Sequence, residues 1–111
     1  MRVSEEESSP ALIWCPFPDR DSAMRVTNFL LDEGLVACVN IVPDMISCFT
    51  WDGVRDEAKE TGALLKTNSA QLAKAIARLE TLHPYEEPAI LGWNCDAASE
   101  GTAAWLGALG K

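Results

Sequence analysis

The side chains of this 111-residue chain that could do chemistry are one histidine, four cysteines and seventeen carboxylates. Thiolate, imidazole and carboxylate groups together are ligands for copper or another divalent transition metal. The histidine opens the run His83-Pro84-Tyr85-Glu86-Glu87-Pro88. The candidate set is Cys15, Glu57, Glu60, His83, Tyr85, Glu86 and Glu87. Within it we assign four metal ligands, namely Cys15, His83, Glu60 and Glu86.

Structural roles compete with this metal assignment. His83 precedes a proline at the end of a predicted helix, where its ring could instead bond a nearby carbonyl. Cys15 lies in an apolar run, where a thiol usually packs as a small hydrophobic group. The carboxylates could form a solvated face. None of the cysteines forms a CxxC pair, so the spacing matches no defined local metal motif.

The sequence does not predict an enzyme or an organic cofactor. A Cys–His pair acts as nucleophile and base only with an orienting third group and an oxyanion site. The phosphate-loop patterns GxGxxG and GxxxxGK[ST] are absent. The four tryptophans are spread one to a predicted element, which favours core and interface packing over a ligand cage.

Composition excludes several partners. The formal net charge of −8 argues against nucleic acid, which requires clustered Lys and Arg, and against anionic membranes. No apolar run approaches the ~20 residues of a membrane span. The N-terminus is acidic and has no apolar core of a signal peptide, so we expect a cytoplasmic protein with reduced thiols. We expect a flexible tail over 1–10 and one domain over 11–111.

The elements that position the candidate residues follow from periodicity and turn signals. Asp21 or Ser22 is expected to cap the first helix, and Asn68 or Ser69 the second. Gly34 and His83-Pro84 are expected to end them. We predict strands over 11–17, 35–42, 45–51, 54–67 and 89–93, with helices to residues 33 and 82 and over 99–109.

This order predicts an α+β, ferredoxin-like fold (split βαβ, βαββαβ) with an added C-terminal helix. Right-handed crossovers place strand 11–17 in the middle of an antiparallel sheet. The end of that strand should then lie near 83–87 and near Glu57 and Glu60. The hairpin around Asp52-Gly53 is too long for the chain's own helices to cover. An uncovered ribbon is prone to association, so we interpret it as an assembly device that pairs with other copies.

From residue 11 to 109 the chain resembles the CutA divalent-cation tolerance family. The motifs that carry the resemblance are Pro18-Asp19, the run from Gly34 to Pro43, Ser47, Trp51-Asp52-Gly53, Glu60, Leu65-Lys66-Thr67 and His83-Pro84-Tyr85-Glu86-Glu87-Pro88. The resemblance implies a homotrimer whose long hairpins pair between subunits. It also implies tolerance of copper and other divalent cations, metal binding by Cys and His, and no established enzymatic reaction.

The sequence thus leads to one principal hypothesis and two alternatives. The first is a homotrimeric, non-enzymatic divalent-cation (copper) tolerance protein that binds metal at an intersubunit cleft. The second is a trimeric signalling module similar to the PII family, which binds a small-molecule effector and a protein partner. The third, an acylphosphatase-type enzyme on the same fold, needs a phosphate-cradling loop with Arg, and Pro16-Phe17-Pro18 offers none.

Overall fold

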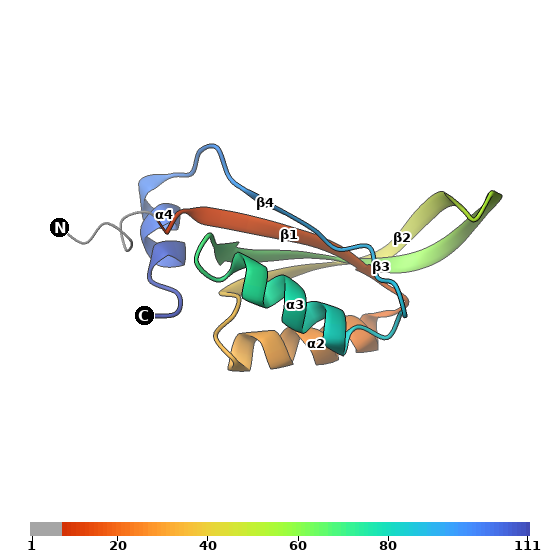
Figure 1. The fold of residues 1–111 in the computed structure, drawn as a ribbon, viewed down its shortest axis with the longest axis horizontal. Helices are drawn as coiled ribbons and strands as arrows, with labels where there is room; N and C mark the ends of the chain where they lie inside the picture. Colours follow the sequence, from red (N-terminus) through yellow and green to blue (C-terminus); the bar gives the residue numbers. More distant parts are fainter. Residues whose placement is uncertain (1–7) are drawn as a thin grey trace.

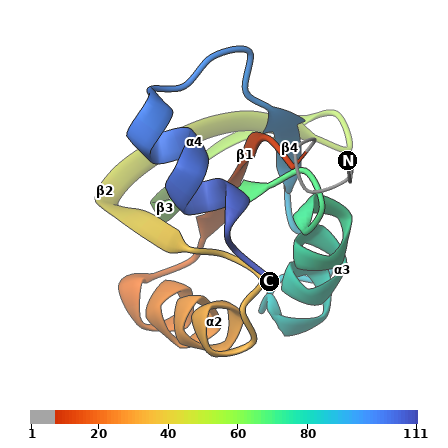
Figure 2. The same cartoon turned by 90° about the vertical axis from the view of Figure 1, so that its left-hand side faces the viewer.

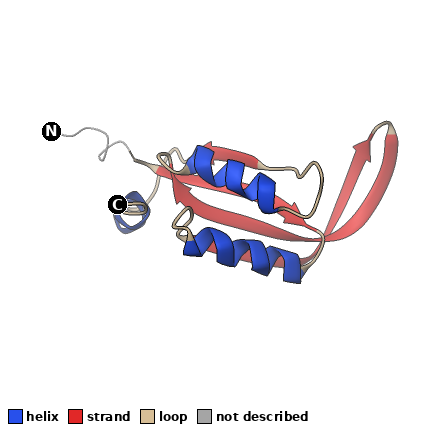
Figure 3. Cartoon of the chain, turned by 60° about the horizontal axis from the view of Figure 1, so that its bottom comes forward, coloured by secondary structure: helices blue, strands red, loops and turns tan. Residues whose placement is uncertain are grey.

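The computed structural model describes residues 8–111 of the chain. The elements in chain order are β1 (Pro10–Phe17), α2 (Arg20–Asp32), β2 (Cys38–Trp51), β3 (Val54–Asn68), α3 (Leu72–Leu82), β4 (Leu91–Asn94) and α4 (Glu100–Gly107). The strands form one antiparallel sheet in the order β2-β3-β1-β4. Helices α2 and α3 cover the same face of this sheet, and α4 lies at the end away from the hairpin tip (Figures 1, 2 and 3).

This is the predicted α+β, ferredoxin-like arrangement with an added C-terminal helix, and β1 lies between β3 and β4 as expected. Successive side chains of β1 alternate between the two faces of the sheet. Ile13, Cys15 and Phe17 face the helices and are fully buried. They pack with Val26 and Leu30 of α2 to form the core that holds the end of β1 in place.

The hairpin of β2 and β3 is as long as the sequence predicts. Its turn residues Asp52 and Gly53 both have positive φ (52° and 78°), as a tight two-residue hairpin turn requires. The pairing is interrupted by a bulge at Pro43 and Asp44, where Asp44 takes a φ of 57°. Figure 1 shows the hairpin curving beyond the ends of both helices, so a single chain leaves it uncovered.

The N-termini of the two longer helices differ from the expected positions. Asp19, rather than Asp21 or Ser22, is the N-cap of α2, and its side chain accepts a hydrogen bond from the Ser22 amide. In α3 the cap residue is Gln71, which makes no side-chain cap bond. The Asn68 side chain accepts the Gln71 amide instead, so it stabilises the turn before the helix.

Several strand boundaries also differ. The predicted strands 35–42 and 45–51 form the single strand β2, which begins at Cys38 rather than at residue 35. Strand β1 begins at Pro10, inside the segment expected to be a tail, because Ser9 exchanges hydrogen bonds with Ser69. Residues 1–7 of that expected tail lie outside the described residues. Strand β4 begins at Leu91 rather than at residue 89. Its ladder with β1 ends there because Pro16, further along β1, has no N–H to donate.

The sheet face opposite the helices is apolar and open. In β4, Gly92 faces the helices, since a Cβ added there would meet two side chains of α3. Leu91 and Trp93 therefore point to the other face, where they are exposed. Their register partners in β1 are Trp14 and Leu12, so large apolar groups lie side by side on this face. In residues 8–111 no helix is long and apolar enough to cross a membrane.

Candidate functional site

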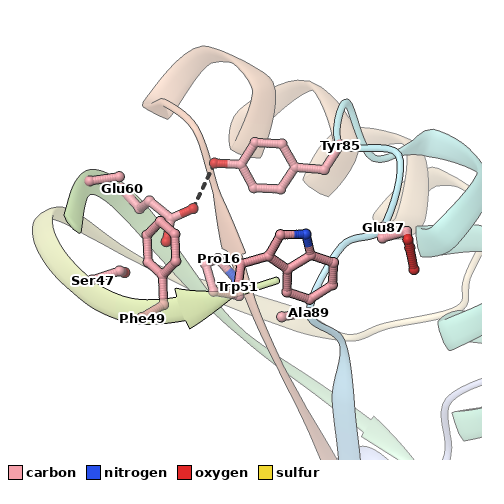
Figure 4. A pocket seen from close by; sticks show the side chains of 9 residues that line it. Pro16, Ser47, Phe49, Trp51, Glu60, Tyr85, Glu87 and Ala89 are labelled. Carbon is pink, nitrogen blue, oxygen red and sulfur yellow. Dashed lines mark hydrogen bonds between the residues drawn. The ribbon is translucent and has the colours of Figure 1, made fainter. Parts of the chain in front are cut away.

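Segments that are distant in the sequence meet at the end of β1, as predicted. The His83 ring nitrogen Nε2 lies 2.8 Å from the Pro16 carbonyl oxygen. The Tyr85 hydroxyl donates to Glu60 Oε2 at 2.6 Å, which joins the segment after α3 to the middle of β3 (Figure 4). Strands β1, β3 and the segment after α3 therefore supply one contiguous site, and the prediction is confirmed for these residues.

His83 is held on both sides of its ring. A carbonyl can only accept and an amide can only donate, so Nε2–H donates to Pro16 and Nδ1 accepts the Tyr85 amide at 3.1 Å. The ring stacks on Phe17 with centroids 4.3 Å apart and is only 7% exposed. Burial lowers the pKa of His83, so the ring is neutral near pH 7. The competing interpretation, a helix-end histidine bonded to a carbonyl, is confirmed.

Cys15 is a protonated, packed thiol. Its side chain is fully buried, and Sγ lies 3.6 Å from the Pro16 carbonyl oxygen. Burial, with a smaller contribution from the negative charge of Glu60, raises the pKa of Cys15 to about 12. A thiolate is therefore scarce at neutral pH, and both nitrogens of His83 are already bonded. The arrangement does not provide a thiolate nucleophile with a free base.

The remaining acidic candidates are spread over different surfaces. Glu86 is exposed on the segment after α3. Glu57 pairs with Cys48 in the outer part of the hairpin, so its predicted proximity to the end of β1 is wrong. Residues 8–111 contain no group of three or more His, Cys, Asp and Glu side chains that could hold a metal ion. The assignment of Cys15, His83, Glu60 and Glu86 as ligands stays a prediction.

Beside this junction lies a cleft of about 570 Å³ between the concave side of the hairpin and the segment after α3 (Figure 4). Its polar groups are Ser47, Glu60, Glu87 and the Tyr85 hydroxyl. Burial, followed by the hydrogen bond to Glu60, raises the pKa of Tyr85, so its hydroxyl stays protonated and donates. The other lining residues are apolar, namely Pro16, Phe49, Trp51, Ala58 and Ala89.

Sequence reasoning missed the hairpin side of this cleft. Ser47, Phe49 and Trp51 recur at every second position of β2, a spacing that places them on one face of the strand. We interpreted the tryptophans as packing residues, whereas Trp51 lines the cleft together with Phe49. The alternation of these three residues was the signal that could have found this side of the cleft. The opposite side, formed by the segment after α3, depends on the tertiary fold.

Comparison with known proteins shows what the chain is related to. Residues 11–108 match the family described as CutA1 divalent ion tolerance protein. The divalent-cation tolerance protein CutA of Pyrococcus horikoshii is 37% identical over 95 residues, covering 86% of this chain and 92% of that protein. Among solved structures, CutA from Xylella fastidiosa has a TM-score of 0.84 at 32% identity and covers 89% of this chain and 95% of that chain.

A second solved structure is the periplasmic divalent cation tolerance protein CutA from Archaeoglobus fulgidus. It has a TM-score of 0.82 at 29% identity, covering 87% of this chain and 94% of that chain. The matches give no support to the PII-like alternative. Since the family match spans most of the chain, the protein belongs to the CutA1 divalent ion tolerance family.

Proposed function

We propose that this protein is a non-enzymatic divalent-cation tolerance protein that works in the cytoplasm as a homotrimer. Its hairpins pair with sister copies, and divalent ions, copper among them, bind at an intersubunit cleft. The family membership supports the tolerance function. The observation that carries the assembly is the long hairpin, together with the apolar sheet face that one chain leaves open.

The hairpin has the features of an interface without its partner. Among residues 8–111, strand β2 is at the edge of the sheet, so its outer N–H and C=O groups have no neighbouring strand there. Large apolar side chains along it are exposed, including Ile46 at 68% and Trp51 at 59%. Leu91 and Trp93 extend the apolar area on the open sheet face. Contiguous apolar surface of this kind is typical of protein–protein contacts.

The donors among residues 8–111 of one chain do not form a metal site, which supports a site shared between copies. Glu60 and Glu86 offer carboxylate oxygens. To take part, His83 must release either the Pro16 carbonyl or the Tyr85 amide, and Cys15 must lose a tightly held proton. Described residues of one chain bring fewer than three suitable donors together, so a second copy would complete the ligand set.

Copper titration of the purified protein by calorimetry tests the metal part of this proposal. We expect saturable binding that weakens by about tenfold or more in Glu60→Gln, because a carboxylate that would contact the metal is lost. The His83→Ala variant tests whether the imidazole is a ligand. Glu80→Gln, on the exposed face of α3, makes the same charge change away from the site and should leave the affinity unchanged. Equal copper binding by all four proteins would contradict the proposed site.

A further inference from the structure

Strand β3 has opposite charges at the two ends of one face. Its residues alternate between the two faces of the sheet, and Ala63 and Leu65 belong to the core beneath the helices. The even-numbered residues from Val54 to Lys66 therefore lie on the open sheet face and its continuation along the hairpin. Lys66 is at the inner end of this row, and Asp56 is near the hairpin tip. The open sheet face thus has a basic end and an acidic end.

Lys66 lies in an otherwise uncharged row across the sheet. Its register partners are Cys38 of β2 and Leu12 of β1, and Leu12 in turn pairs with Trp93 of β4. The ion pairs found in residues 8–111 do not include Lys66, which is only partly exposed. When another copy covers this face, the ammonium group loses water, and a desolvated charge is destabilising unless it gains a partner. The covering copy must therefore supply a negative group.

Asp56 is the carboxylate of this face that is available to another copy. Lys66 and Asp56 of one chain are ten positions apart on β3, about 33 Å at the usual rise of a strand, so they cannot pair with each other. Glu60 lies between them and already accepts the Tyr85 hydroxyl at 2.6 Å within the proposed metal site. In residues 8–111, Asp56 is exposed and accepts a hydrogen bond from the adjacent Glu57 amide alone. Its negative charge is therefore free to bind an ammonium group.

The shape of the chain places Asp56 where a neighbour can meet it. Figure 1 shows the outer half of the hairpin, which carries Asp56, projecting beyond both helices. In a ring of three copies each contact is heterologous, so a patch on one copy meets a different patch on the next. We propose that Lys66 of each copy forms an ion pair with Asp56 on the hairpin of the next copy, and that three such pairs close the ring. The proposal rests on the homotrimer proposed above and identifies the charges that hold it together.

Subunit exchange of the full chain measures what this pair contributes. Unlabelled trimers are mixed with ¹⁵N-labelled trimers of the same variant in the presence of EDTA, and native mass spectrometry follows the formation of mixed trimers. Lys66→Met and Asp56→Asn should each exchange at least about tenfold faster than wild type, because the loss of one partner of a desolvated charge pair speeds dissociation. Lys74→Met on α3 and Asp32→Asn on α2 make the same changes at exposed positions of the helical face and should exchange within about twofold of wild type.

A charge swap shows whether the two residues meet. Lys66→Asp should speed exchange more than Lys66→Met does, because it places two carboxylates opposite each other. Adding Asp56→Lys to the same chain restores an opposite-charge pair at every contact of the ring. The double variant should therefore exchange within about threefold of wild type, whereas Asp56→Lys alone should exchange as fast as Lys66→Asp. This rescue separates a direct pair from a loss of stability within each chain.

Two results would overturn the pairing and leave the homotrimer in place. The first is exchange within about twofold of wild type in either Lys66→Met or Asp56→Asn. The second is fast exchange of Lys66→Asp that Asp56→Lys does not slow, which would give Lys66 a different partner, such as a dissolved anion. A single-chain mass for the wild-type protein would overturn the homotrimer and the pairing together. Because EDTA is present throughout, none of these results depends on copper binding.

Discussion

His83→Ala should destabilise the protein by about 3 kcal/mol. The ring makes hydrogen bonds to the Pro16 carbonyl and from the Tyr85 amide, each contributing about 1 kcal/mol. Its stacking on Phe17 at 4.3 Å adds about 1 kcal/mol. His83→Phe keeps the stacking and loses both hydrogen bonds, so it should lose about 2 kcal/mol.

Urea unfolding at one fixed protein concentration measures these losses, since assembly makes the midpoint depend on concentration. Glu80→Ala on the exposed face of α3 is the control and should unfold within about 0.5 kcal/mol of wild type. A similarly small loss for His83→Ala would refute the reasoning, because it would mean that the ring does not anchor the segment after α3.

The same residue should give stability a pH dependence, and it is the chain's one histidine. Burial lowers the pKa of His83 from its ordinary value of 6.5, while the Pro16 hydrogen bond and Glu60 oppose the shift. The unfolded chain therefore binds more protons just below pH 6.5. The stabilising contribution of the neutral His83 ring is complete above pH 6.5. It is lost as the pH falls from 6.5 toward the lower pKa that His83 has in the folded protein. His83→Phe should remove this step, and an unchanged step would contradict the assignment.

Three further predictions concern the fold around the site. Asn68→Ala should lower the free energy of unfolding by about 3 kcal/mol, because the buried side chain donates to the carbonyls of Leu106 and Leu109 and accepts from the Gln71 amide. Urea unfolding measures the loss, and Asn28→Ala at an exposed position is the control that should have little effect. Cys15 should resist iodoacetamide until the protein unfolds, as followed by mass spectrometry, because its pKa is about 12; rapid labelling of the native protein would contradict this. Gly53→Ala should cost about 1 kcal/mol in thermal unfolding because of its φ of 78°, whereas Gly101→Ala in α4 should be neutral or stabilising.

The sheet order and the hairpin were predictable because local signals agree with the global fold. The Asp52-Gly53 turn needs positive φ at both residues, and the structure has it. The convergence of His83 and Pro16 followed from placing the first strand in the middle of the sheet, and the 2.8 Å contact bears this out. In both cases the prediction used only chain order and turn chemistry.

The cleft was not predictable, because it depends on how two distant segments curve toward each other. The hairpin changes direction at the bulge around Pro43 and Asp44, and no periodicity in the sequence reports that change. The early end of the β1–β4 ladder has a similar origin. Pro16 cannot donate to the ladder and its carbonyl is taken by His83, so residues 89 and 90 run past β1 unpaired. They leave Ala89 free to line the cleft.

The proposed assembly is tested most directly by the mass of the protein in solution. Light scattering on the purified chain at micromolar concentration should return three times the single-chain mass of 12.1 kDa, with and without copper. A mass of 12.1 kDa would contradict the account, because the hairpin and the open sheet face would then remain exposed to water in the working protein.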